Sequence, residues 1–177
     1  MRARVLAVGG FVLAGFAIIA APSWGQVASP PAKADCKFAD GKTIHVDYSS
    51  PRMRGRKIFG GLVPYGEPWR VGANEATTFM IDTDVNVGGT NVSAGSYTLF
   101  ALPNPDSWQL IINNTTGEWG IPYPGEDSDF ARVPMKLSKL SSPLEDFTIG
   151  FDSDGKTCAM HLDWDTTRAT VDIAEKK

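Results

Sequence analysis

The chain has few of the residues on which catalytic and redox chemistry most often depends. Its 177 residues include two cysteines and two histidines, and they contain no Cys-x-x-Cys and no Gly-x-Ser-x-Gly sequence. These absences argue against a dithiol redox centre and a nucleophile elbow, respectively. A hydrolase of the Ser–His or Cys–His type would have to use His45 or His161. We therefore expect no cofactor, and the sequence offers no specific catalytic motif.

Long apolar runs are confined to the amino terminus. Arg2 and Arg4 precede an uncharged apolar stretch over 5–21, and Ser23-Trp24-Gly25 then supplies the small residues that a signal peptidase reads. This pattern predicts a signal peptide over 1–25, with an uncleaved membrane anchor as the alternative. Because no second such run follows, we expect no membrane span after signal cleavage. The predicted location is periplasmic or extracellular.

The charge balance argues against a nucleic-acid partner. The chain has 17 basic and 20 acidic residues, a net charge of −3. Loss of Arg2 and Arg4 with the signal leaves 15 basic residues against 20 acidic ones, a net charge of −5. Such a surface repels a phosphate backbone.

The two cysteines are expected to form one disulfide. Export would take Cys36 and Cys158 to an oxidising compartment, where a pair of cysteines usually becomes a bridge. Two buried free thiols, or a redox role, are the alternatives.

The dominant period of the sequence is two residues, which predicts β-strands rather than helices. Apolar and polar residues alternate over 44–49, 147–151, 160–164 and 169–173, and Gly, Pro and Asn lie between these segments. The segment 97–102 is apolar on both faces and should be a central strand. We predict an all-β, single antiparallel β-sandwich, plausibly of jelly-roll type, over 42–177. Residues 26–41, rich in Pro and Ala, are expected to be a leader ahead of this domain.

One segment, Gly55–Thr78, is too rich in Gly and Pro for a helix and too rich in aromatic and charged residues for a slack linker. It predicts one long ordered loop, and ordered loops often hold binding or catalytic residues. Its block from Tyr48 to Thr78 resembles the bacterial family DUF2911, as do Ala94–Phe100, Trp108 and Trp119-Gly120. The resemblance extends over about Lys42 to Ile173. It implies an exported, mostly β protein and supplies no reaction.

The strongest candidate site lies in this loop. A guanidinium, a carboxylate, an amide and aromatic faces could together bind a sugar or a carboxylate-bearing peptide. The candidate contacts are Trp69, Arg70, Asn74 and Glu75, with Tyr65 and Trp119 as apolar walls. The alternative is that Arg70 and Glu75 pair with each other and hold the loop together.

Two weaker candidates lie elsewhere. A basic cluster could attract phosphate, sulfate or an acidic polysaccharide, or could be an ordinary solvated surface; its members are Arg52, Arg54, Arg56 and Lys57. Two His-x-Asp units could converge on a metal if their strands were neighbours; they comprise His45, Asp47, His161 and Asp163. Polar residues on a wet sheet face are the more ordinary reading of the second set, so we expect no metal.

The sequence therefore favours a binding or envelope-associated module that uses the 55–78 loop. Its ligand would be a glycan or another envelope component. One alternative is a hydrolase, directed at glycans or peptides, with Glu75 as acid or base. Such an enzyme needs a second carboxylate, and Glu118 and Glu126 are the candidates. The other alternative is a purely structural envelope protein.

Overall fold

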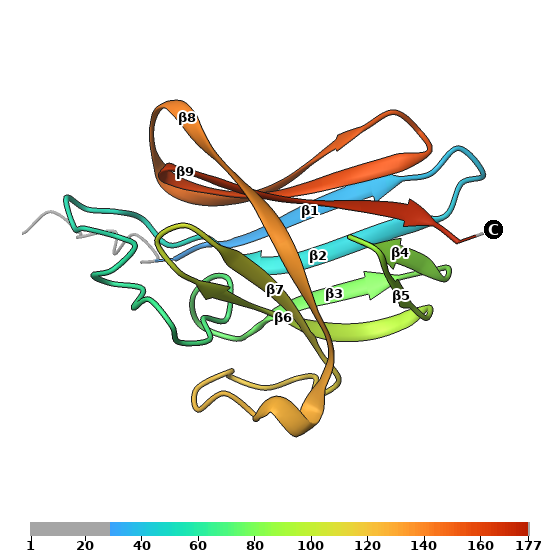
Figure 1. Cartoon of the computed structure of the whole chain (residues 1–177), viewed down its shortest axis with the longest axis horizontal. Helices are drawn as coiled ribbons and strands as arrows, with labels where there is room; N and C mark the ends of the chain where they lie inside the picture. Colours follow the sequence, from blue (N-terminus) through green and yellow to red (C-terminus); the bar gives the residue numbers. More distant parts are fainter. Residues whose placement is uncertain (1–28, 177) are drawn as a thin grey trace, which may run out of the picture.

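The computed structural model describes residues 29–176, and their regular structure is almost entirely β (Figure 1). The strands are β1 (Pro31–Lys37), β2 (Thr43–Ser49), β3 (Thr77–Ile81), β4 (Val85–Val87), β5 (Thr90–Val92), β6 (Gly95–Pro103), β7 (Trp108–Asn113), β8 (Asp129–Ser153) and β9 (Thr157–Glu175). Among the described residues, the single helix is a short 3-10 turn, η1 (Glu126–Ser128).

All nine strands belong to one open antiparallel sheet. Their order across the sheet is β1-β2-β3-β6-β7-β8-β9-β4-β5, and every neighbouring pair is antiparallel. The all-β, antiparallel prediction is therefore confirmed, whereas the jelly-roll arrangement is not.

The long strands β8 and β9 bend the sheet over itself. The first part of β8 pairs with β7, and its register with β9 shifts twice between Lys139 and Thr148. Asp165 on β9, which pairs with Leu144 between these two shifts, has a positive φ of 53°. Such irregularities bend a strand and increase its twist. Beyond the bend, the β8–β9 hairpin lies beside β1 (Figure 1).

The core lies between the two ends of this curled sheet. The largest fully buried side chains include Trp164, Phe79, Phe147, Leu99 and Ile44. The two layers also meet through a polar contact, because the backbone N–H of Ile149 donates to the Tyr48 hydroxyl at 3.1 Å. Burial raises the pKa of that phenol. The two ends of the sheet thus close around the main core, and a smaller cluster of Ala76, Phe100 and Ile111 is separate from it.

The strand expected to be central holds that position. Residues Tyr97 to Ala101 of β6 are all buried, and β6 lies between β3 and β7. A strand covered on both faces has no polar face, which is why its sequence does not alternate.

The leader expected over 26–41 needs correction. From Pro31 onward the chain is a strand, and β1 pairs with β2 in register from Pro31↔Ser49 to Lys37↔Thr43. Its inward residues include Ala34 and Cys36, both buried. Small inward side chains gave too weak a hydrophobic pattern to predict a strand, and Pro31 is tolerated because it begins an edge strand. Residues 26–28 and the expected signal peptide lie outside the described residues.

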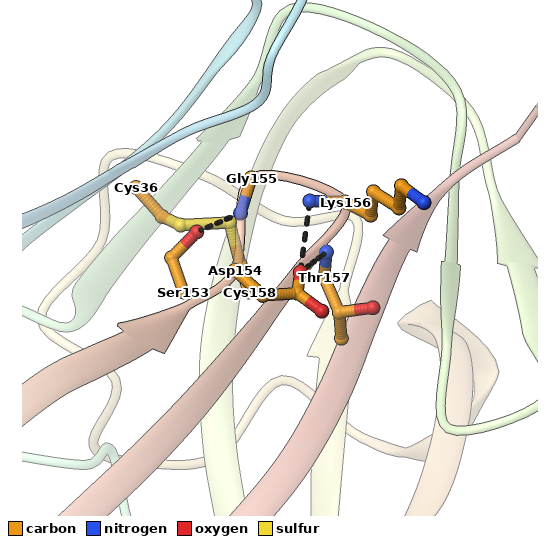
Figure 2. The surroundings of a disulfide bond; sticks show 7 residues. All are labelled: Cys36, Ser153, Asp154, Gly155, Lys156, Thr157 and Cys158. Carbon is orange, nitrogen blue, oxygen red and sulfur yellow. Dashed lines mark hydrogen bonds between the residues drawn. A yellow bond between two sulfur atoms is a disulfide. The ribbon is translucent and has the colours of Figure 1, made fainter.

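The predicted disulfide is confirmed. Cys36 on β1 is bonded to Cys158 on β9 across 122 residues, with their Cα atoms 6.2 Å apart (Figure 2). Beside it, Asp154 Oδ1 accepts hydrogen bonds from the N–H groups of Lys156 and Thr157, which close the β8–β9 turn. These backbone bonds lower the pKa of Asp154. The bridge therefore fastens the tip of this hairpin to the first strand of the sheet.

No helix among residues 29–176 is long and apolar enough to cross a membrane.

Candidate functional site: a basic cleft beside Arg70

The chain between β2 and β3, residues 50–76, is the long loop at one end of the sheet (teal to green in Figure 1). It is ordered by its own buried residues, Ile58, Val63 and Val71. It is also tied to the sheet, because Trp69 and Ala101 exchange two backbone hydrogen bonds of 2.8 Å. This contact extends the edge of β6 into the loop and fixes the backbone immediately before Arg70.

Trp69 forms the floor of the loop. Its ring stacks on Trp164 with centroids 5.9 Å apart and meets the edge of Phe147 at 5.0 Å. Its indole N–H donates to the carbonyl of Gly72 at 3.2 Å. Trp69 is therefore half-buried and anchors the loop to β8 and β9, while part of it lines a cavity.

Asn74 also stabilises the loop through hydrogen bonds of its side chain. Its side-chain amide donates to the Ser29 carbonyl at 3.1 Å and to Ser49 Oγ at 3.2 Å. The residue has a positive φ of 58°, a conformation that asparagine tolerates better than most residues. Both contacts are internal, and they hold the loop against the end of β2.

Arg70 and Glu75 do not pair. Within residues 29–176, neither side chain forms an ion pair or a hydrogen bond. Between them, Val71 has a φ of 52° and Asn74 one of 58°. These left-handed residues redirect the chain, so Glu75 is exposed and lines a separate cavity of about 170 Å³. The carboxylate that lines this cavity with it is Asp47, which Lys33 binds at 2.7 Å.

Arg70 is the exceptional side chain of the loop. Its Nε is buried and has no hydrogen-bond partner among the described residues. Its guanidinium carbon lies 5.9 Å from the centre of the Trp119 ring, which is 53% exposed. Burial lowers the pKa of Arg70, because desolvation disfavours the charged form. A cation in this position lacks a counter-charge, and an anionic ligand would supply one.

Gly120, next to Trp119, packs closely against the first side-chain carbons of Arg70 and Ala76. A Cβ added at Gly120 would lie 2.9 Å from the Cβ of Ala76 and 3.2 Å from the Cβ of Arg70. Gly120 also has a positive φ of 76°. Glycine is therefore required both by the backbone conformation and by the close approach.

We expect Gly120→Ala to lower the free energy of unfolding by about 2–4 kcal/mol, because strain and crowding add. Gly117→Ala is the matched control: φ is 71° there, but nothing lies within 4 Å of the added Cβ. The control should cost about 1 kcal/mol. Urea unfolding of both variants measures the difference, and equal losses would show that Gly120 does not press on Arg70.

Arg70 lies at the junction of two adjoining cavities, each of about 380 Å³. Both are lined by Leu62, Val63, Trp69, Arg70 and Ile121. We call the two together the Arg70 cleft. Volumes in this range are typical of sites for small molecules.

We call the first cavity the basic lobe. It is lined by residues from two candidate sites predicted from the sequence, the 55–78 loop and the basic cluster. Arg52, Arg54 and Arg56 line it together with Arg70, and none of its described lining residues is acidic. Arg52 Nε lies 2.9 Å from Asp146 Oδ1, so this arginine has a counter-charge. Arg56 donates to the carbonyls of Arg52 and Met53, whereas the Arg54 side chain has no partner within 29–176. The lobe thus carries an excess of positive charge on an acidic protein.

The second cavity, the apolar lobe, has a different lining. Beyond the shared residues, it is formed by Pro64, Pro68, Gly120, Tyr123 and one acid, Glu67. Tyr123 is held by hydrogen bonds to Asp129 and Arg132. Burial, together with the bond to Asp129, raises the pKa of Tyr123 to about 12, so the phenol stays neutral.

Of the remaining sequence candidates, Tyr65 and Lys57 are exposed and line neither lobe, whereas Trp119 covers Arg70 from outside. Leu62 and Ile121, which are 43% and 66% exposed at the junction of the lobes, were not predicted from the sequence. A large apolar residue in a Gly- and Pro-rich segment is the signal that could have identified them. Trp164, which comes from the distant strand β9, was not predicted either.

The two His-x-Asp units do not converge, so the idea of a shared metal site is wrong. They lie on β2 and β9, which are not neighbours in the sheet. His45 Nδ1 lies 2.7 Å from Asp35 Oδ1, and Asp47 binds Lys33. Among residues 29–176, no group of three or more His, Cys, Asp or Glu side chains could hold a metal.

The second unit is also buried rather than wet. His161 Nδ1 lies 3.0 Å from Asp163 Oδ2, and Arg168 Nε and Nη2 donate to the two oxygens of the same carboxylate at 2.8 and 2.6 Å. The His161 ring occupies the space where Gly150, its partner across the ladder, has no side chain. This group is a closed internal network.

The fold and the cleft together define a protein class: an all-β protein with a disulfide and an arginine-lined cleft on its longest loop. The chain belongs to the DUF2911 family of proteins of unknown function, whose model matches residues 29–173. No curated protein and no solved structure shows a significant match to the chain.

Proposed function

We propose that this is an exported binding protein whose Arg70 cleft holds the anionic group of a ligand. The observation that carries the proposal is Arg70 itself, a partly desolvated cation without a carboxylate partner among the described residues. Hydrogen bonds between charged groups are stronger than neutral ones, and a guanidinium can donate two at once to a carboxylate or phosphate. Export is supported by the disulfide, since such bonds persist in oxidising compartments.

The neighbouring arginines support the same ligand chemistry. The side chains of Arg54 and Arg56 form no ion pair within 29–176, and both residues line the same lobe as Arg70. Their positive potential would attract an anion and orient it toward Arg70. Trp69 and Trp164 form the apolar wall beside it.

Tryptophan fluorescence tests the proposal, because two indoles line the basic lobe. The protein is titrated with phosphate, sulfate, butanoate and benzoate at constant ionic strength, with chloride as the balancing ion. We expect a saturable change in fluorescence for at least one of these anions. Arg70→Gln should weaken binding by roughly tenfold or more, as expected for loss of a charge-assisted hydrogen bond.

Two controls make the result specific. Lys136→Gln removes an exposed cation outside the cleft and should bind as the wild type does. The melting temperature of Arg70→Gln should stay close to that of the wild type, because no hydrogen bond or ion pair of Arg70 is lost, only its contact with the exposed Trp119 ring. A wild type that responds to none of the anions, or an Arg70→Gln variant with full affinity, would refute the proposal.

A further inference from the structure

The two lobes of the Arg70 cleft differ in a way that restricts the ligand. The basic lobe has arginine side chains and no acid among its described lining residues, whereas the apolar lobe has prolines, Tyr123 and Glu67. Arg70, Leu62 and Ile121 belong to both. A ligand that fills the whole cleft would therefore meet positive charge on one side of Arg70 and apolar surface on the other.

We infer that the ligand is an amphipathic organic anion, with its charged group in the basic lobe and an apolar tail in the apolar lobe. The inference rests on the proposed function, because it presupposes that Arg70 binds the anion. The position of Glu67 also sets the orientation of the ligand in the cleft. Its carboxylate would repel an anionic head from the apolar lobe and leave that lobe to the tail.

The exposed side chains around the cleft support an apolar tail. Leu62 and Ile121 are 43% and 66% exposed, and both lie where the lobes join. Large apolar side chains that gather at the rim of a cavity commonly mark a binding site. A tail lying between them would remove their surface and its own from water, which favours binding in proportion to the area buried.

A series of straight-chain carboxylates from butanoate to decanoate, kept below micelle-forming concentrations, tests the inference. Each added methylene that enters the apolar lobe should raise affinity by roughly two- to fourfold. Octanoate should also bind more tightly than 8-aminooctanoate, because a terminal ammonium would have to be desolvated. A tighter 8-aminooctanoate would overturn the inference and indicate a zwitterionic ligand that uses Glu67.

Two variants at the junction of the lobes test where the tail of the ligand lies. Ile121→Ser and Leu62→Ser should each flatten the dependence on chain length while butanoate affinity changes little. Phe130→Ser is the matched control, since Phe130 is 40% exposed but packs on Tyr97 and lines neither lobe. Its chain-length series should follow that of the wild type. If only one of these two variants folds, that variant is enough for the test. An unchanged dependence of affinity on chain length in a folded variant would overturn the inference.

The outcomes separate the inference from the proposed function. If butanoate binds through Arg70 and longer chains bind no better, the amphipathic ligand is refuted and the anion site stands. If no member of the series binds and the inorganic anions fail as well, both are refuted.

Discussion

Replacing both cysteines, Cys36→Ala with Cys158→Ala, is expected to lower the free energy of unfolding by on the order of 4–5 kcal/mol. The disulfide joins residues 122 positions apart, so its loss frees a very long loop in the unfolded chain. In a domain of this size the loss corresponds to a fall of roughly 10–15 °C in Tm. Both sulfur atoms belong to buried residues, so alanine also leaves small cavities.

Urea unfolding with and without dithiothreitol measures this effect. The wild type should lose about the same stability when it is reduced, whereas the double alanine variant should not respond to the reductant. The hairpin that the bridge fastens to β1 should become the first region to exchange its amide hydrogens. A variant within about 1 kcal/mol of the wild type would show that sheet contacts alone hold this hairpin.

Asp163→Asn is expected to cost about 3 kcal/mol at neutral pH, because it removes the buried carboxylate that Arg168 binds and leaves Arg168 only the exposed Asp152, 3.8 Å away. Burial alone would raise the pKa of Asp163, but hydrogen bonds from His161 and Arg168 outweigh it, and the pKa is lowered below the usual 3.8. A carboxyl with a depressed pKa stabilises the fold above its unfolded pKa. That contribution is lost as the pH falls through about 4 and below.

The measurement is the free energy of unfolding from pH 7 to pH 2.5. The wild type should lose stability over the acidic part of this range more steeply than Asp163→Asn does. Asp172→Asn serves as the control: its partner is exposed Lys136, and the change should cost less than about 1 kcal/mol. Parallel pH profiles for the wild type and Asp163→Asn would contradict the assignment of this carboxylate as a stabilising group.

Much of the fold could be predicted because most strands bury one face. Alternation identified β2 and β9, and the apolar run of β6 identified a central strand. The same method failed at β1, where the inward residues are the small Ala34 and Cys36. It also placed His161 and Asp163 on a wet face, whereas both are buried, because alternation does not record that His161 fills the space beside Gly150 and that Arg168 binds Asp163.

The candidate site was predictable in composition but not in geometry. The basic cluster and Arg70 looked like separate features, and only the folded loop brings them to one cavity. Arg70 and Glu75 looked like a pair because an ordered, irregular loop needs internal contacts to hold it together. The left-handed backbone at Val71 and Asn74 sends them to different cavities, and such conformations are rare for a β-branched residue.

The central claim is that Arg70 is the anion receptor of this protein. NMR of the arginine Nε–H groups in a ¹⁵N-labelled sample, titrated with octanoate, tests it most directly. The account predicts a saturable shift of the Arg70 Nε–H signal, together with the indole signal of Trp69. The Nε–H signal of Arg168, already bound to Asp163, should not move. An Arg70 signal that stays fixed, or that drifts without saturation in parallel with the Arg168 signal, would contradict the claim.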